Sequence, residues 1–173
     1  MKYYDIIKNI KGSATVIFDT GLSDVEISRI EEIYAIKLPE SLKELYKIAL
    51  PVGEKDERIP YPKWRDFSPE NIEKIKGMMY PYEAPNEHSS IEYPPLIPIW
   101  GHRYLPICEL ADPPVISCVE FDIIWYAKNL SEALQMDFLC DPFSVSAKIP
   151  HPKQVPYIPL WSEAVEYNLR GFI

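Results

Sequence analysis

The sequence has little glycine: six residues in 173, arranged in neither a GxGxxG nor a GxxxxGK pattern. Glycine-rich loops with these patterns hold nucleotide phosphates through their backbone N–H groups. Because these patterns are absent, we do not expect this chain to bind nucleotides through a glycine-rich loop.

Cysteine and histidine are also scarce. Cys108, Cys118 and Cys140 are odd in number and widely spaced, and no CxxC motif occurs. This spacing favours reduced thiols in a cytosolic protein over a disulfide framework. The three histidines are isolated and no HExxH motif is present, whereas a metal site needs ligands that cluster with suitable spacing. We therefore expect no metal and no cofactor.

Long apolar runs and an excess of basic charge are missing as well. No segment approaches the roughly 20 apolar residues that span a bilayer, and the N-terminal sequence MKYYDIIKNIKG lacks the apolar stretch of a secretory signal. We expect a cytoplasmic protein without membrane contact. The 26 acidic residues outnumber the 18 basic ones and give a net charge of −8, which disfavours binding to nucleic acid phosphates. The acidic balance fits a basic partner, and it also fits simple solubility.

The most informative stretch that is present runs from Leu22 to Gly53. Its sequence, LSDVEISRIEEIYAIKLPESLKELYKIALPVG, predicts an antiparallel pair of amphipathic helices over Ser23–Leu50. Ser23 and Glu26 have the spacing of a capping box, and Pro39 can occupy the first position of the second helix. The polar stretch GEKDER that follows predicts an exposed connection. Some carboxylates on the solvent-facing sides of these helices could meet a basic partner: Asp24, Glu31, Glu32 and Glu40.

The rest of the chain predicts a sheet and further helices. The region Leu96–Tyr126 is rich in β-branched and aromatic residues with short connections, which favours an antiparallel meander. One helix is expected after Ser68, with Pro69 in its first turn, and another after Asn129. Further expected elements are a helix, a strand and a closing helix: Tyr3–Ile10, Ala14–Phe18 and Trp161–Leu169. We therefore expect one α+β domain over residues 1–173, with a central, largely antiparallel mixed sheet covered by helices.

An acidic helix, a Leu-Pro turn and a second helix that ends near a glycine resemble the opening of the SUKH superfamily. These are bacterial relatives of the fungal Smi/Knr regulators of cell-wall synthesis. The segments PLIPIWGHRYLP (Pro95–Pro106) and PPVISCVEFDIIWYAKNLSEAL (Pro113–Leu134) are similar to the later strands of that family and to its ending of a sheet and a short helix. The resemblance covers about two thirds of the chain. It does not extend to the proline-rich span Ile59–Pro98 or to the tail after Cys140.

The resemblance implies an intracellular immunity protein, not an enzyme, that neutralises a cognate toxin domain by direct protein–protein binding. An acidic inhibitor would attract a basic toxin, such as a nuclease, through charge steering. The alternative is a non-enzymatic regulatory or scaffold module like the fungal relatives. A third class is an enzyme that acts on a small molecule or sugar, which would need a closed pocket with mutually perturbed titrating groups.

The stretch WRDF holds the first two candidate partner contacts, Trp64 and Arg65. Tryptophan and arginine are enriched in binding hot spots. Their structural alternative is that Trp64 anchors the core, as large aromatic residues usually do, while Arg65 pairs locally.

The stretch GHRY holds the other candidates, His102, Arg103 and Tyr104. Arg103 could donate to a carboxylate of a partner through its forked guanidinium group. In the structural alternative the stretch is a tight turn whose polar groups bond within the chain. Cys118 with His102 could form a thiol–base pair, but the position of Cys118 within an alternating strand pattern favours packing.

Overall fold

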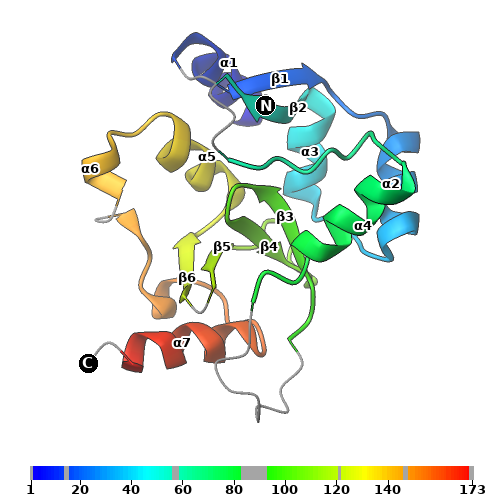
Figure 1. Ribbon diagram of the computed structural model, residues 1–173. Coiled ribbons are helices and arrows are strands. Elements are labelled where there is room, and N and C mark those ends of the chain that lie inside the picture. The colour runs from blue at the N-terminus through cyan, green and yellow to red at the C-terminus, as the bar shows by residue number, and fades with distance from the viewer. Residues whose placement is uncertain are drawn as a thin grey trace.

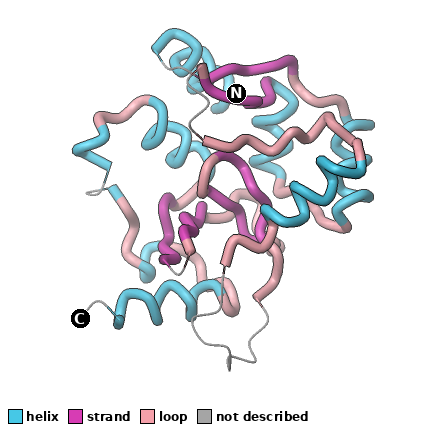
Figure 2. Tube along the Cα trace, in the orientation of Figure 1, coloured by secondary structure: helices cyan, strands magenta, loops and turns pink. Residues whose placement is uncertain are grey.

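Two antiparallel sheets surrounded by helices confirm the α+β fold class that the sequence predicts. The computed structural model describes residues 2–13, 16–55, 59–82, 93–120, 122–145 and 148–171. A four-stranded sheet lies at the centre, and a two-stranded sheet lies near the N-terminus (Figure 1 and Figure 2).

The first part of the chain combines helices with the two-stranded sheet. Its elements are, in order, α1 (Lys2–Ser13), β1 (Val16–Thr20), α2 (Asp24–Tyr34), α3 (Glu40–Ile48) and β2 (Ala49–Glu54). The predicted N-terminal helix, early strand and helical pair are therefore all present. Ala14, where we expected the strand to begin, lies outside the described residues.

The capping box predicted for α2 is present. The N–H of Glu26 donates to the Ser23 hydroxyl at 3.2 Å, and the N–H of Ser23 donates to the Glu26 carboxylate at 2.7 Å. The helix ends at Ala35, whose left-handed backbone (φ 51) turns the chain toward α3. The position predicted for Pro39 is wrong by one residue, because its extended backbone (ψ 152) makes it the N-cap of α3.

The strand β2 is a feature that the sequence analysis placed wrongly. We assigned its first residues to the end of a helix and its last ones to an exposed connection, but residues 49–54 pair antiparallel with β1. The connection before α2 is held against the end of α3, since the Leu22 N–H donates to the Tyr46 carbonyl at 2.7 Å. A side chain at Gly21 would collide with the carbonyl of Lys47. The hydrogen-bond partners of β2 thus lie far away in the sequence, and tertiary pairing overrides the local signals.

The central sheet is the predicted antiparallel meander. Its strands lie in the order β3 (Leu96–Trp100), β4 (Arg103–Pro106), β5 (Val115–Val119) and β6 (Asp122–Ala127), each antiparallel to its neighbours. The helix α4 (Pro69–Met78) precedes it and begins, as predicted, after the N-cap Ser68.

The last part of the chain is helical. Its elements are α5 (Leu130–Phe138), α6 (Pro142–Val145), the 3-10 helix η2 (Pro152–Gln154) and α7 (Trp161–Gly171). α5 begins after the predicted cap Asn129, whose side chain accepts from the backbone N–H of Glu132 at 3.0 Å. α7 packs along β6 (Figure 1). No helix in the described ranges is both long enough and apolar enough to cross a membrane.

Each face of the central sheet is buried against different helices. On one face, strand side chains pack with those of α1, α2, α3 and α5 in a first core, to which the sheet contributes Ile97, Ile99, Leu105, Val115 and Tyr126. On the other face, Tyr104, Ile116, Cys118, Ile123 and Trp125 pack against α7 in a second core. Side chains alternate between the two faces of a strand, so the meander separates the two cores and leaves no open sheet face.

Candidate functional site

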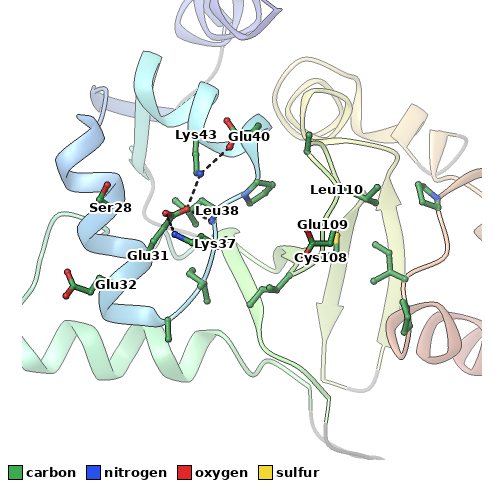
Figure 3. Close-up of a pocket in the computed structure, with 18 of the residues that line it drawn as sticks. Ser28, Glu31, Glu32, Lys37, Leu38, Glu40, Lys43, Cys108, Glu109 and Leu110 are labelled. Carbon is green, nitrogen blue, oxygen red and sulfur yellow. Dashed lines mark hydrogen bonds and ion pairs between the residues drawn. The ribbon is translucent and has the colours of Figure 1, made fainter.

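A large open groove lies where three distant parts of the chain meet. One wall is α2 with the turn into α3, and the other consists of the β4–β5 connection and the segment before α7 (Figure 3). Its volume is about 1210 Å³, and its lining residues come from the ranges 28–43, 107–111 and 156–159. Apolar side chains and prolines form much of its surface: Ile36, Leu38, Pro39, Ile107, Leu110, Pro156, Ile158 and Pro159.

The carboxylate of Glu31 fixes the first wall of the groove. It accepts from the Leu38 N–H at 2.9 Å and from the ammonium groups of Lys37 and Lys43, each at 3.1 Å. Lys43 also pairs with Glu40 at 3.2 Å. Burial alone would raise the pKa of Glu31, but these hydrogen bonds outweigh it and lower the pKa. Figure 3 shows Lys37 and Lys43 converging on this carboxylate, so both lysines are already engaged.

Two other carboxylates of the groove have no basic partner among the described residues. They belong to Glu32 on α2 and to Glu109 on the opposite wall, and both residues are exposed. In Figure 3, Glu32 points away from the ion-paired cluster around Glu31. A second, more open hollow on α2, lined by Asp24, Val25 and Arg29, shares Ser28 and Glu32 with the groove. The two hollows therefore form one continuous surface, which we call the α2 face.

The carboxylates that the sequence analysis expected to face solvent all line the α2 face, with one correction. Glu32 and Glu40 are exposed, and Asp24 is exposed although it pairs with Lys47 at 2.6 Å. Glu31 is instead only 10% exposed. It lies inward because the turn after α2 brings the backbone of Leu38 and two lysines to it.

Several hydrogen-bond donors along the groove are used within the chain. The N–H groups of Ala35 and Ile36 donate to carbonyls of α2, and the Ile158 N–H donates to the Ser162 hydroxyl at 2.9 Å. The Tyr157 hydroxyl donates to the carboxylate of Glu163. Proline has no N–H to offer, and three prolines line the groove. Among the described residues, the charged side chains of the groove that have no ion-pair partner are the acceptors Glu32 and Glu109.

A second polar cluster surrounds Asp137, at the end of α5. Its carboxylate accepts from the Trp100 indole at 2.8 Å, from the Tyr126 hydroxyl at 2.5 Å and from two nitrogens of Arg103 at 3.1 Å. Arg103 also donates to the Ser117 hydroxyl at 2.9 Å, and its guanidinium lies 3.5 Å from the centre of the Tyr126 ring. Burial and the nearby Asp137 carboxylate raise the pKa of Tyr126. We call these five side chains the Asp137 cluster.

A small cavity of about 130 Å³ adjoins the Asp137 cluster, and His102 and Glu54 line it. His102 is an exposed residue, yet desolvation of its imidazole and the charge of Arg103 lower its pKa. Of the five partner contacts predicted from the sequence, His102 is the one exposed side chain. Its contact with a partner stays a prediction.

The other four predicted contacts are engaged inside the molecule. Trp64 is buried and donates from its indole to the Tyr46 hydroxyl at 3.1 Å. Arg65 bonds to Glu26 and Asp19, each at 2.8 Å, and to the carbonyls of Thr20 and Gly21 at 2.9 and 2.8 Å. The structural alternative therefore describes Trp64, whereas Arg65 pairs with carboxylates 39 and 46 residues earlier in the chain and not locally as that alternative predicts.

Tyr104 and Cys118 lie together in the second core. Burial raises the pKa of Tyr104 to about 12, with a further contribution from Cys118. Burial also raises the pKa of Cys118 to about 12, with a smaller effect of Asp122. A thiol with such a pKa is not a nucleophile at neutral pH, which agrees with the packing interpretation of Cys118. His102 meets Cys118 through the backbone, since the Cys118 N–H donates to the His102 carbonyl at 3.0 Å.

Within the part of the chain that the structure describes, no three histidine, cysteine, aspartate or glutamate side chains cluster in a way that could hold a metal ion. Comparisons with protein-family models, with curated proteins and with solved structures give no match for this chain.

The sequence analysis missed Asp137 and Glu109. Asp137 carried a usable signal, because it is a charged residue next to the apolar face of a predicted helix that also holds Leu134 and Phe138. A carboxylate in that position needs partners inside the protein. Glu109 carried no such signal, since its importance depends on a wall of the groove that only the fold creates.

Proposed function

We propose that this protein is a cytoplasmic, non-enzymatic immunity protein of the SUKH type, which neutralises a cognate toxin domain by binding it directly. The observation that carries the proposal is an open groove lined by two exposed carboxylates, Glu32 and Glu109, that have no basic partner among the described residues. An open surface with exposed acids suits a macromolecular partner of opposite charge, whereas small molecules are usually enclosed.

Charge supports a basic toxin domain such as a nuclease. The chain carries a net charge of −8, and acidic groups on a docking surface speed the encounter with a basic partner and set its orientation. Binding over the basic active site of such a toxin would block its substrate, so neutralisation needs no chemistry from this protein.

The test is rescue in cells. The gene next to the one for this protein is examined for a toxin-bearing open reading frame, and the last domain of that toxin is expressed with and without this protein. We expect co-expression to restore growth and the two proteins to purify as a complex. Failure of rescue, with this protein expressed in soluble form, would contradict the proposal.

The same experiment separates the rival role as a regulatory or scaffold module. That role predicts several protein partners in an affinity purification and no toxin gene beside this one. Because the proposed role predicts one dominant, basic partner, the number and charge of the captured proteins decide between the two.

A further inference from the structure

We propose that the groove binds an extended segment of the partner that carries arginine side chains on either side of a short apolar run. This inference rests on the proposed function and adds to it the chemistry of the bound segment. The inference depends on which side chains of the groove already form hydrogen bonds or ion pairs within the chain and which do not.

The charged groups of the groove favour a ligand with a cationic hydrogen-bond donor. Lys37 and Lys43 already neutralise Glu31, while Glu32 and Glu109 have no basic partner within the described ranges. An anionic ligand in the groove would meet these two carboxylates, and both lysines of the lining are already ion-paired, while Arg29 on the adjoining hollow stacks on the Phe67 ring. A guanidinium group supplies several N–H donors in a planar fork that matches a carboxylate, so an arginine can engage each wall.

An exposed ring beside the groove favours arginine over lysine. Tyr157 lines the groove, is 67% exposed and has its hydroxyl bound to Glu163. Its ring position is therefore partly fixed while much of its surface remains open. A guanidinium group stacks on such a ring as well as pairing with an acid, whereas a lysine ammonium is more strongly hydrated.

The rest of the groove lining suits an apolar, extended chain. Ile36, Leu38 and Leu110 are among its apolar lining residues, and prolines lie on both walls. Proline restricts the backbone, and Glu31 holds the turn that presents Leu38. Such a preformed surface lowers the entropic cost of binding a partner segment.

The first experiment uses a synthetic peptide in which two arginines flank a Leu-Pro-Leu run, together with a matched peptide in which citrulline replaces both arginines. Citrulline keeps the length and planarity of arginine and removes its charge. Two-dimensional NMR of the whole protein, which detects even millimolar binding, is recorded during titration with each peptide. We expect the arginine peptide to shift the amide signals of Ile36, Leu38, Leu110 and Tyr157, and to bind at least about tenfold more tightly than the citrulline peptide.

The second experiment changes the protein. The double variant E32K/E109K reverses the charge of both carboxylates, and the control D5K/E73K makes the same change in net charge on α1 and α4, at exposed residues that do not line the groove. We expect the first variant to weaken binding of the arginine peptide by about tenfold or more and the control to change it by less than about twofold. NMR spectra of the free variants verify that each is folded.

Equal binding of the two peptides, shifts outside the groove, or unchanged binding by E32K/E109K would overturn the inference. The proposed function is tested separately, by the rescue of cells. If E32K/E109K still rescues cells from the toxin, the groove inference fails and the immunity role stands. If the arginine peptide binds in the groove but the protein rescues no cells, the immunity role fails and the groove inference stands.

Discussion

The Asp137 cluster and the groove both bring carboxylates next to apolar surface, but they satisfy them differently. Asp137 accepts four hydrogen bonds from side chains of its own chain. In the groove Glu31 is satisfied in this way and Glu40 pairs with Lys43, whereas Glu32 and Glu109 have no basic partner among the residues described. Buried polar groups that lack partners cost free energy, whereas exposed ones are paired with water at little cost. The contrast indicates that the cluster stabilises the fold and that the groove is free to meet another molecule.

The largest expected effect on stability comes from a substitution in the Asp137 cluster. Asp137→Ala leaves Arg103, which is only 13% exposed, without its carboxylate partner. We expect the free energy of unfolding to fall by about 3 kcal/mol, measured by urea denaturation. Glu73→Gln, which removes an exposed pair with Lys76, is the control and should cost less than about 0.5 kcal/mol. A loss in Asp137→Ala as small as that of the control would show that the cluster is not a stabilising centre.

An intermediate case is Arg65, which is 30% exposed and joins the β1–α2 connection to the segment before α4. We expect Arg65→Met to lower the free energy of unfolding by about 1–2 kcal/mol, because it removes hydrogen bonds to two carboxylates and two carbonyls. Arg170→Met is the matched control, since Arg170 is 80% exposed and its ion-pair partner among the described residues is Glu166 in the same helix. The same denaturation experiment ranks the two variants, and equal values would contradict the role given to Arg65.

The carboxylate partner of Arg65 gives this contact a pH dependence. The hydrogen bond from Arg65, followed by those from Ser23, lowers the pKa of Glu26 from 4.5 to about 2. Because the folded-state pKa is below the unfolded one, the contribution of Glu26 is fully present above about pH 4.5 and is lost as the pH falls toward 2. We expect the free energy of unfolding of wild type to exceed that of Glu26→Gln by about 1 kcal/mol at pH 7, and the difference to be mostly lost at about pH 2, where half of the folded-state carboxyl groups are protonated. Urea denaturation of both proteins across this range tests it, and a constant difference would refute it.

The smallest expected effect on stability comes from the groove. E32K/E109K changes two exposed side chains that have no ion-pair partner within the described ranges. We expect its free energy of unfolding to stay within about 0.5 kcal/mol of wild type, measured under the conditions used for Asp137→Ala. A substantial loss would mean that these acids stabilise the fold and would weaken the contrast between the two regions.

Much of the fold could be predicted from the sequence because its signals are local. Three helix starts are indicated by capping residues that lie close together in the sequence: Ser23 with Glu26, Ser68 with Pro69, and Asn129. The meander follows in the same way from strand-like segments with short connections. The strand β2 was assigned wrongly because its partner β1 lies about 30 residues earlier in the chain.

The candidate site was less predictable than the fold. Trp64 and Tyr104 were candidates for their residue type, and their residue type also explains why they are buried. The groove needs three segments that no sequence spacing relates, from α2 and α3, from the β4–β5 connection and from the stretch before α7. Of the two groove carboxylates without a basic partner in the described ranges, Glu32 was indicated by the polar face of a predicted helix, and nothing in the sequence singled out Glu109.

The four tryptophans offer an optical reporter for each side of the central sheet. Trp64 and Trp100 lie in the first core and donate to Tyr46 and Asp137, whereas Trp125 and Trp161 lie in the second core. The indole N–H groups of the second pair have no acceptor among the described residues. Fluorescence emission from Trp125 and Trp161 should therefore lie at shorter wavelengths than that from Trp64 and Trp100. The rate at which this short-wavelength emission is lost during denaturation would report the detachment of α7, separately from that of the helices on the opposite face.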